Sequence, residues 1–370
     1  MESVLLMPEP SAKELKAQKK QQKQAQRAAK RDVPSISTVD TPKEVVKLSI
    51  LGNIEPPKPL EDISQEDVHP EILALATKYR RCEILGSSAR AQAMLECFHS
   101  IIGEFDVPPD ASPSRQLAFH LNKQIEVLKV ARALSVSMGN AIRWLKQQIT
   151  TLSPELSAPE AKSKIKDLIQ GFIRDQIVVA NRVIVDHTLP MIKQGAKILT
   201  YGHSEVVYLT LKAAQDKGLA ISTVVVDSSP LFEGKRLATR LADLGIPVEY
   251  AMIHALPYLV DDTISCVLQG AHAMTSNGHL ISRSGTSLIS MATSVRNIPF
   301  LVLCETIKFS DRVQLDAFTY NETIPLENLT TDYLFYDLSD SKYISKVVTE
   351  IGALPASSVP VILREYKQLQ

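Results

Sequence analysis

The feature that most constrains the fold is a change of hydrophobic period near residue 196. Downstream of it, short apolar runs alternate with segments of helical period. The apolar runs cover residues 197–201, 221–227, 248–253, 263–268 and 299–304, and the helical segments lie near 205–217, 234–244, 256–262 and 285–297. Such alternation is typical of a parallel sheet with right-handed crossovers. Residues 192–370 are therefore predicted to form a Rossmann-like α/β domain with a mainly parallel sheet, completed by a strand at 333–337, a helix near 342–352 and a strand at 358–364.

Upstream of the change the hydrophobic period is helical, which predicts a helical domain over residues 69–191. Its helices are expected at 71–82, 88–104, 114–132, 137–150 and 159–188, with breaks at Pro108-Pro109 and residues 151–154. Two apolar stripes mark core faces. They consist of Met138, Ile142, Leu145 and Ile149, and of Ile165, Ile169, Ile173, Ile177, Ala180 and Ile184. Helix packing is favoured over a ligand site around Trp144, the only tryptophan, which lies just off the first stripe.

The first 68 residues differ in composition from the rest. Residues 1–31 carry eight basic and three acidic side chains, a balance of +5, whereas the whole chain has 41 of each sign. Residues 32–68 contain five prolines. A disordered basic tail and a Pro-rich linker are therefore expected over 1–68. A solvated tail is favoured over a weak contact with RNA or an acidic partner.

The chain is expected to be a cytosolic protein without a membrane span. No apolar run approaches the roughly 18 residues that a span needs, and Val4–Met7 is too short for the core of a signal peptide. The four cysteines form no Cys-x-x-Cys pair. Buried free thiols in a reducing compartment are the simplest interpretation.

The loop after the first strand argues against a dinucleotide cofactor. Residues 201–205 lack the Gly-x-Gly-x-x-Gly pattern, and no Gly-Lys-Ser/Thr phosphate loop is present. Asp227 ends the second strand, where it could accept bonds from sugar hydroxyls or cap the following turn; both interpretations are open. Catalysis by His203 and His272, or a metal held by His272 and His279, lacks a supporting Cys/Glu cluster. No cofactor and no metal are predicted.

Residues 267–286 combine a strand end, a turn and a helix start, a junction where α/β proteins bind ligands. Asn277-Gly278 is a turn signal, and Ser284-Gly285-Thr286 precedes a helix. Its apolar residues recur at helical spacing: Leu288, Met291 and Val295. The free N–H groups of this helix, with Arg283, could hold a phosphate or carboxylate. The favoured alternative is that Ser284 caps the helix.

Residues 270–279 and 283–286 resemble a segment of one known family. It unites the alpha, beta and delta subunits of eukaryotic translation initiation factor two-B with methylthioribose-1-phosphate and ribose-1,5-bisphosphate isomerases. The isomerases have a catalytic aspartate where this chain has His272, a catalytic cysteine where it has Gly202, and an arginine where it has Ser229. The resemblance implies no catalytic residues and a vestigial pocket formed by Gly202, Asp227, Ser229, His272, Asn277, Arg283, Ser284, Gly285 and Thr286.

Other motifs are similar to the regulatory subunits within that family. Residues 86–90 and 135–145 resemble delta members, while 304–309, 312–318 and 357–364 resemble beta and delta members. The resemblance covers about 69–366. It implies a non-catalytic regulatory subunit of the guanine nucleotide exchange factor for initiation factor two, which helps to sense that factor's phosphorylated alpha subunit.

The expected partners are the alpha, beta, gamma and epsilon subunits of the complex and initiation factor two itself. A contact in the helical domain is predicted at Arg132, Ser135, Met138, Asn140 and Arg143. Two alternatives remain open. One is a sugar-phosphate isomerase with substituted catalytic groups, and the other is a ligand-sensing module that keeps the pocket without the chemistry.

Overall fold

The computed structural model describes residues 19–20, 68–108, 112–154, 156–324 and 333–369. The described residues from 68 onward belong to one compact unit. The predicted basic tail and linker, residues 1–68, lie outside the described residues except for Lys19, Lys20 and Val68. In the described part of the chain, no helix has the length and apolar character that crossing a membrane requires. All four cysteines are free thiols. Three of them are buried as predicted, but Cys82 is only partly buried.

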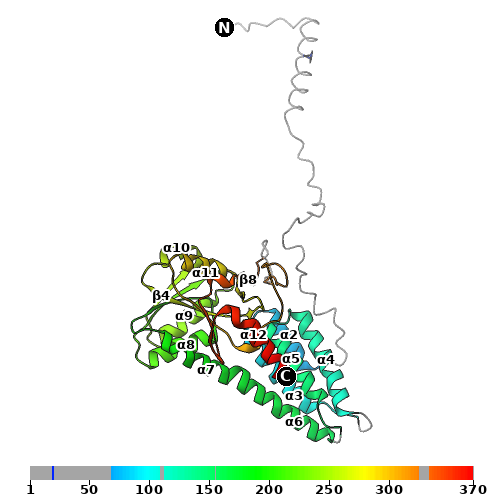
Figure 1. Ribbon diagram of the computed structural model, residues 1–370. Coiled ribbons are helices and arrows are strands. Elements are labelled where there is room, and N and C mark those ends of the chain that lie inside the picture. The colour runs from blue at the N-terminus through cyan, green and yellow to red at the C-terminus, as the bar shows by residue number, and fades with distance from the viewer. Residues whose placement is uncertain (1–18, 21–67, 109–111, 155, 325–332, 370) are drawn as a thin grey trace, which may run out of the picture. The chain divides into compact units, whose positions relative to one another are not determined.

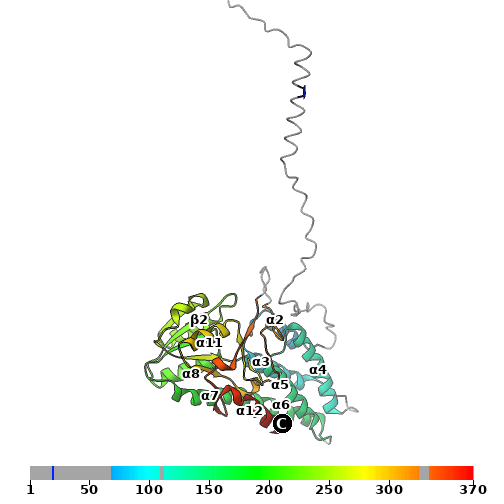
Figure 2. The ribbon, with the colours of Figure 1, turned by 45° about the horizontal axis from the view of Figure 1, so that its top comes forward.

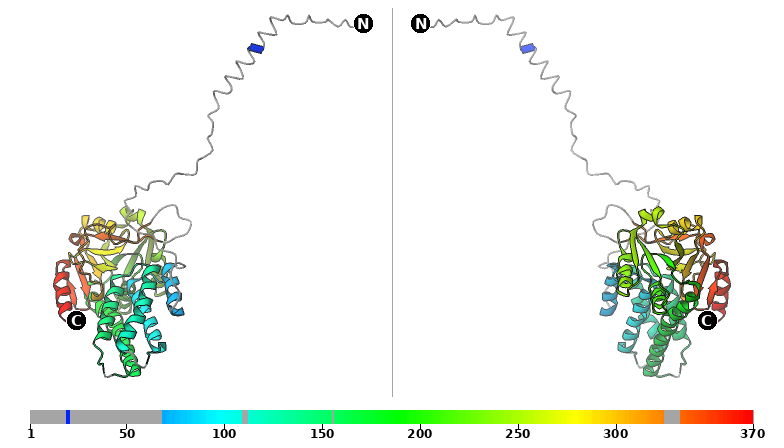
Figure 3. Two further views of the ribbon diagram at one scale, coloured as in Figure 1. Left: turned by 90° about the vertical axis from the view of Figure 1, so that its right-hand side faces the viewer. Right: turned by 90° about the vertical axis from the view of Figure 1, so that its left-hand side faces the viewer.

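Five helices form the helical layer, which lies along one side of the α/β layer (Figures 1 and 3). They are α2 (Pro70–Arg80), α3 (Ser87–Glu104), α4 (Pro113–Ala131), α5 (Val136–Thr150) and α6 (Ala158–Ile173). Their bounds lie within two residues of the predicted ones, except that α6 ends at Ile173 whereas the predicted helix continues to residue 188. Local signals start them: Ser135 caps α5 by accepting a bond from the Met138 amide, and Ser157 forms a capping box with Glu160 at α6. The predicted stripe of α5 lies in the helical core, each member at most 7% exposed.

The long helix predicted at 159–188 is continuous but not uniform. It consists of α6, a π-helical stretch η2 (Arg174–Val179) and α7 (Ala180–Thr188). Ile165 and Ile169 lie in the core of the helical layer, whereas Ile184 lies in the core beneath the sheet. One helix thus contributes to both cores. The boundary at 191/192 stays a prediction.

The seven-stranded sheet has the order β10-β9-β7-β4-β1-β2-β3. Its strands are β1 (Lys197–Tyr201), β2 (Ser222–Asp227), β3 (Val248–Met252), β4 (Ile264–Gly270), β7 (Phe300–Leu303), β9 (Lys346–Thr349) and β10 (Gly352–Leu354). All neighbours are parallel except β10 and β9, which confirms the mainly parallel α/β sheet. Val224, Val225 and Val226 are each fully buried, as expected for a strand covered on both faces.

Helices cover both faces of this sheet (Figures 1 and 2). On one face, α7, α8 (Glu205–Asp216) and α9 (Glu233–Asp243) share a core with the strands. On the other, α10 (Leu256–Leu259), α11 (Thr286–Val295) and α12 (Val359–Leu369) share a second core. The carboxyl ends of β1 and β4 lie near the start of α3 in the helical layer. A ligand site is expected at this edge of an open α/β sheet.

The C-terminal part corrects three predictions. The helix near 342–352 is wrong, because Val347 and Val348 pair in β9 and Gly352, at φ 134°, turns the chain into antiparallel β10. The strand at 358–364 is also wrong: these residues lie in η7 (Ala356–Ser358) and α12, where Val359 and Ile362 are buried at helical spacing. The strand at 333–337 shifts to β8 (Tyr336–Ser339) and joins a second sheet.

That second sheet has three antiparallel strands in the order β5-β6-β8. The chain between β5 (Ala273–Met274) and β6 (Leu280–Arg283) contains the predicted Asn277-Gly278 turn. The Gly278 amide donates to the Thr275 carbonyl there, and its φ of 78° suits glycine. The sheet therefore delivers Arg283 and Asp337 to the same region.

Asn140 on α5 joins the helical layer to the α/β layer. Its Nδ2 donates to the carbonyls of Ile307, at 2.7 Å, and Phe309, at 3.1 Å. Ile307, in η5 (Thr306–Lys308), also inserts its side chain into the helical core. These contacts fix η5 against α5.

We expect Asn140→Ala to lower the free energy of unfolding by about 1–3 kcal/mol, because two carbonyls in a partly buried position lose their donor. Urea denaturation followed by circular dichroism measures the change. Arg143→Ala, at an exposed position on the same helix, is the control and should stay within about 0.5 kcal/mol. Equal effects of the two substitutions would contradict the role given to Asn140.

Candidate functional site

A cavity of about 630 Å³ lies beyond the carboxyl ends of β1 and β4. Its wall comes from the start of α3, the loops after β1 and β4, the start of α9, and β6. Two predicted pocket residues, His272 and Arg283, line it. This is the edge at which open α/β sheets bind ligands, so its charged groups decide what the cavity can do.

Arg283 is already engaged within the chain. Its guanidinium binds Glu233 through both Nε and Nη2, the latter 3.0 Å from Oε1, and the two side chains are 16% and 13% exposed. Burial alone would lower the pKa of Arg283, but Glu233 raises it above its ordinary value. The guanidinium therefore stays charged and neutralised. A phosphate could bind Arg283 only by displacing Glu233, a residue that the sequence did not predict to lie in the site.

His272 is held as a neutral imidazole. Its ring lies 3.9 Å, centroid to centroid, from that of Tyr336. Burial, followed by the nearby charges of Arg283 and Arg90, lowers the pKa of His272 well below its ordinary value. At neutral pH the imidazole is uncharged and carries a proton on only one nitrogen. Its lowered pKa also makes it a weak base, so it is a poor replacement for a catalytic carboxyl group.

The second cation of the cavity wall is paired as well. Lys308 Nζ lies 2.7 Å from Glu305 Oε2, and both side chains are less than 8% exposed. Ser88 donates to the other oxygen of Glu305 at 2.7 Å. Apart from the spacing of three residues, no sequence pattern indicates this pair. The two buried cations of the lining are thus each paired with a carboxylate of the same chain, whereas the exposed Arg236 also lines the cavity.

Asp227 accepts hydrogen bonds from groups of its own chain. It is 2% exposed, and its oxygens accept bonds from the amides of Ser228 and Lys235 and from the Tyr250 hydroxyl. A β-carbon on Gly234 would lie 2.7 Å from Asp227 Cγ, so this close packing needs glycine. Of the two open interpretations, capping is the one observed.

The start of α11 is capped from another strand. Oδ2 of Asp337 on β8 accepts bonds from the amides of Gly285, at 2.7 Å, and Ser287, at 2.8 Å. The prediction that Ser284 caps this helix is therefore wrong: the N-cap residue is Gly285, at φ 113°, which has no side chain. The proposed phosphate cradle at this helix start is filled by a carboxylate of the chain itself.

The remaining predicted pocket residues do not line the cavity. Gly202, at φ 65°, donates its amide to Val226 and offers no nucleophile. Ser229 precedes a cis proline. Asn277 binds the Gln314 carbonyl, and the Thr286 hydroxyl binds the Arg283 carbonyl. Of the nine predicted positions, the cavity thus brings together only His272 and Arg283. Among the described residues, no group of His, Cys, Asp and Glu is arranged to hold a metal ion.

The predicted contact residues of the helical domain are mostly buried. Arg132 is 4% exposed and binds Glu322, with Nε 2.7 Å from Oε2. Ser135 and Met138 are also buried, and Asn140 faces η5. The side chains of Arg132, Ser135 and Met138 are therefore not accessible to a partner in this structure. Arg143 is exposed, and its contact stays a prediction.

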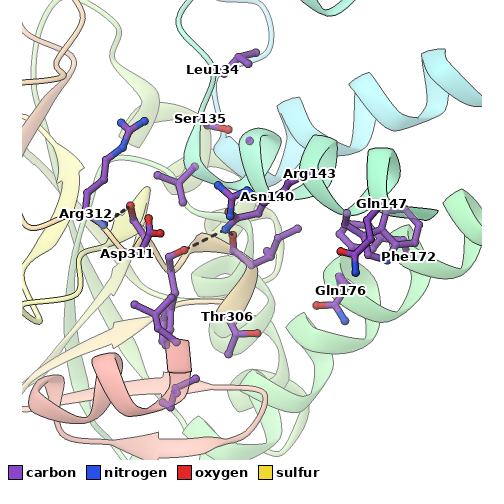
Figure 4. A pocket seen from close by; sticks show the side chains of 18 of the residues that line it. Leu134, Ser135, Asn140, Arg143, Gln147, Phe172, Gln176, Thr306, Asp311 and Arg312 are labelled. Atoms are coloured by element: carbon purple, nitrogen blue, oxygen red, sulfur yellow. Dashed lines mark hydrogen bonds between the residues drawn. The ribbon is translucent and has the colours of Figure 1, made fainter. Parts of the chain in front are cut away.

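A second cavity of about 470 Å³ lies between α5, η2, η5 and α12 (Figure 4). Trp144 and Phe172 stack on its wall with centroids 4.1 Å apart. Arg143, Gln147 and Gln176 line it together with Arg312. Its lining contains neither cysteine nor histidine. Its ionisable side chains are Arg143, Arg312 and the carboxylate Asp311.

One family model and several known proteins match most of this chain. A family model described as "Initiation factor 2 subunit family" matches residues 83–356. The delta subunit of translation initiation factor eIF2B from Schizosaccharomyces pombe is 38% identical over 328 residues, which cover 82% of this chain and 70% of that protein. The delta subunit from Dictyostelium discoideum is 36% identical over 324 residues, covering 81% of this chain and 52% of that protein, so the chain spans about half of its length.

An enzyme and a solved complex are also similar. Ribose 1,5-bisphosphate isomerase from Archaeoglobus fulgidus is 27% identical over 305 residues, covering 80% of this chain and 93% of the enzyme. A chain of the tetrameric eIF2B-beta2-delta2 complex from C. thermophilum is 34% identical, with a TM-score of 0.76. The match covers 80% of this chain and 96% of that one.

We expect Glu233→Gln to lower the free energy of unfolding by about 3–5 kcal/mol, because it leaves Arg283 buried without a counter-charge. Chemical denaturation measures this change. The control is Glu249→Gln, which removes the half-exposed carboxylate that lies 3.2 Å from Lys197 Nζ. It should cost less than about 1 kcal/mol. A small effect at Glu233 would mean that Arg283 is free to bind an anion.

Asp337 should make stability depend on pH. Burial raises the pKa of Asp337 to about 7 from 3.8. A folded state that binds the proton more tightly than the unfolded chain gains stability from it at low pH. The gain is complete below about pH 4 and is lost as pH rises through 7. Asp337→Asn should remove this slope in denaturation curves measured across that range. An unchanged slope would assign it to another group.

Proposed function

Because the chain belongs to the initiation factor 2 subunit family, we propose that it is a delta-type regulatory subunit of the exchange factor eIF2B. The observation that carries the proposal is its similarity, over 96% of the matched chain, to a component of a complex of beta and delta subunits. The 38% identity to a delta subunit supports delta over the other members. In this role the chain is a scaffold within a larger assembly that exchanges guanine nucleotides on initiation factor two.

The chemistry of the cavity supports a non-catalytic subunit. An isomerase must give and take a proton between adjacent carbons. Gly202 and His272 stand at the positions that the resemblance assigns to the catalytic cysteine and aspartate, and the imidazole is neutral. Arg283 and Lys308, the buried cations of the wall, are neutralised by carboxylates of the same chain. This chain is therefore similar to the isomerase but lacks the groups that the resemblance implies for catalysis.

The regulatory mechanism that we propose is a shift between two arrangements of the complex. The subunit assembles in the cytosol with the alpha, beta, gamma and epsilon subunits and receives initiation factor two. Its helical layer contacts that factor's alpha subunit, with Arg143 as the exposed contact candidate. Phosphorylation favours a non-productive arrangement by differential affinity, which lowers exchange. The alternative role, sensing of a sugar phosphate, is favoured only by the size of the cavity near Arg283.

We expect affinity purification of the tagged chain from cytosol at moderate salt to recover the other four subunits in stoichiometric amounts. Native mass spectrometry determines the composition. The purified chain should not turn over ribose 1,5-bisphosphate. It should also show no thermal shift with sugar phosphates, whereas a ligand at a hundred times its Kd adds about 2.7 kcal/mol of stability. A lone homo-oligomer with a clear thermal shift would instead support the ligand-sensing alternative.

A further inference from the structure

The cavity between α5, η2, η5 and α12 contains the only tryptophan of the chain. The sequence favours helix packing for Trp144, and the indole does pack against the helical core. It is only partly buried, however, and lines the cavity together with Phe172, on which it stacks. An aromatic surface left open inside a cavity offers a planar ligand a place to stack.

The cavity has the dimensions of a small-molecule site. Its volume of about 470 Å³ falls within the range of roughly 300–1,000 Å³ that such sites have. Both layers of the molecule contribute to its wall, the helical layer through α5 and the α/β layer through η5 and α12. Small-molecule sites are mostly apolar, with a few polar groups that fix the orientation of the ligand. The apolar part of this lining consists of Leu134, Val136, Trp144, Phe172, Ile307, Phe309, Ile362 and Leu363.

Carboxamide side chains form much of the polar part of the lining. They are Asn140, Gln147, Gln148 and Gln176. A carboxamide carries a donor and an acceptor side by side, a pattern that complements the edge of a nitrogen heterocycle. Asn140 is occupied by two backbone carbonyls, whereas the Gln176 carboxamide has no hydrogen-bond partner among the described residues. Gln176 lies with Phe172 at one end of the cavity (Figure 4), which is where a heterocyclic ring would find both contacts.

Arg143 gives this cavity a cation that is not neutralised by a partner. Among the residues that the structure describes, none forms a hydrogen bond or an ion pair with its guanidinium. Two arginines, Arg143 and Arg312, and one carboxylate, Asp311, leave the lining with a net charge of +1. Arg283 and Lys308 of the first cavity, by contrast, are paired with carboxylates. Arg143 is therefore available to an anion of a ligand.

We propose that this cavity binds a small heterocyclic acid, a molecule with a planar nitrogen heterocycle and one phosphate or carboxylate group. The ring lies against the Trp144 indole with the Gln176 carboxamide at its edge, and the acid group binds Arg143. A guanidinium and an oxyanion form strong, charge-assisted hydrogen bonds. The site is separate from the first cavity, since the two share no lining residue. The inference does not depend on the subunit role proposed above.

Two pairs of variants test the site. Gly139 on α5 lines the cavity, and a β-carbon there would have no heavy atom within 4 Å. Gly139→Leu therefore fills the space of the ligand, and replacing glycine within a helix favours folding. Gly171→Leu is the matched control, because a β-carbon on Gly171 also meets open space, but in a groove along α6 on which Trp144 borders as well. Arg143→Ala removes the cation, and its control is Lys146→Ala, an exposed lysine of α5 outside the lining.

The single tryptophan makes the measurement direct, because its fluorescence reports on the wall of the cavity. The full chain is titrated with adenosine 5′-monophosphate and with orotate, a phosphate and a carboxylate of the proposed class. Adenosine keeps the ring without the acid group, and ribose 5-phosphate keeps the acid group without the ring. Isothermal titration calorimetry measures each Kd independently of the fluorescence.

We expect at least one of the two acids to quench the Trp144 fluorescence with saturation, and the acid that does so distinguishes a phosphate ligand from a carboxylate ligand. Arg143→Ala should raise the Kd by about 10-fold or more, because the charge-assisted hydrogen bonds are lost. Adenosine should bind more weakly than its monophosphate for the same reason. Gly139→Leu should abolish binding, whereas Gly171→Leu and Lys146→Ala should leave the Kd unchanged.

Several results would overturn the proposal. One is that neither acid quenches the fluorescence of the folded wild type. Another is that ribose 5-phosphate binds as tightly as adenosine 5′-monophosphate, since the ring would then contribute nothing. Binding that survives Gly139→Leu but is lost in Gly171→Leu would place the ligand in the groove along α6 instead. Circular dichroism establishes that each variant is folded, and if Gly139→Leu is not, the comparison of Arg143→Ala with Lys146→Ala decides.

Discussion

Buried guanidinium groups require carboxylates within reach, and this requirement organises the centre of the molecule. Arg283 from the small sheet binds Glu233 at the start of α9, and Arg132 from the end of α4 binds Glu322. Both guanidinium groups also lie over the ring of Phe335, at 5.3 and 4.0 Å from its centroid. Removing one partner of such a pair leaves a charge without compensation. The pairs therefore hold the helical layer, the main sheet and the small sheet in one arrangement.

Ion pairs of this kind also limit what the cavity beyond β1 and β4 can bind. A ligand site for sugar phosphates needs cations that are free to meet an anion. Here carboxyl groups of the chain itself take these positions: Glu233 at Arg283, Glu305 at Lys308, and Asp337 at the helix start at Gly285. The carboxyl groups of the chain thus occupy the positions at which a ligand's anion could meet these groups.

Much of the fold was predictable because it depends on local patterns. The helical period located α2 to α5 and the start of α6 within two residues, and the apolar runs located β1 to β4 and β7. The failures depend on distant partners. Nothing near Ser284 indicates that Asp337, some fifty residues later, caps α11, and nothing near Arg283 indicates Glu233. Residues 346–354 form strands because β7 is there to pair with, which a single sequence does not reveal. Of the predicted site, only His272 and Arg283 line the cavity. Asp227 and Asn277 instead bind backbone groups 8 and 37 residues away, which only the folded chain brings near.

The helix that runs from Ala158 to Thr188 has a mechanical consequence. At about 1.5 Å per residue, its 31 residues extend roughly 45 Å as a single rod anchored in two cores. No loop interrupts it at which the two layers could swing independently. A displacement of the helical layer is therefore transmitted along this rod toward the sheet, through the π-helical stretch, where the backbone bonding pattern departs from that of the α-helix.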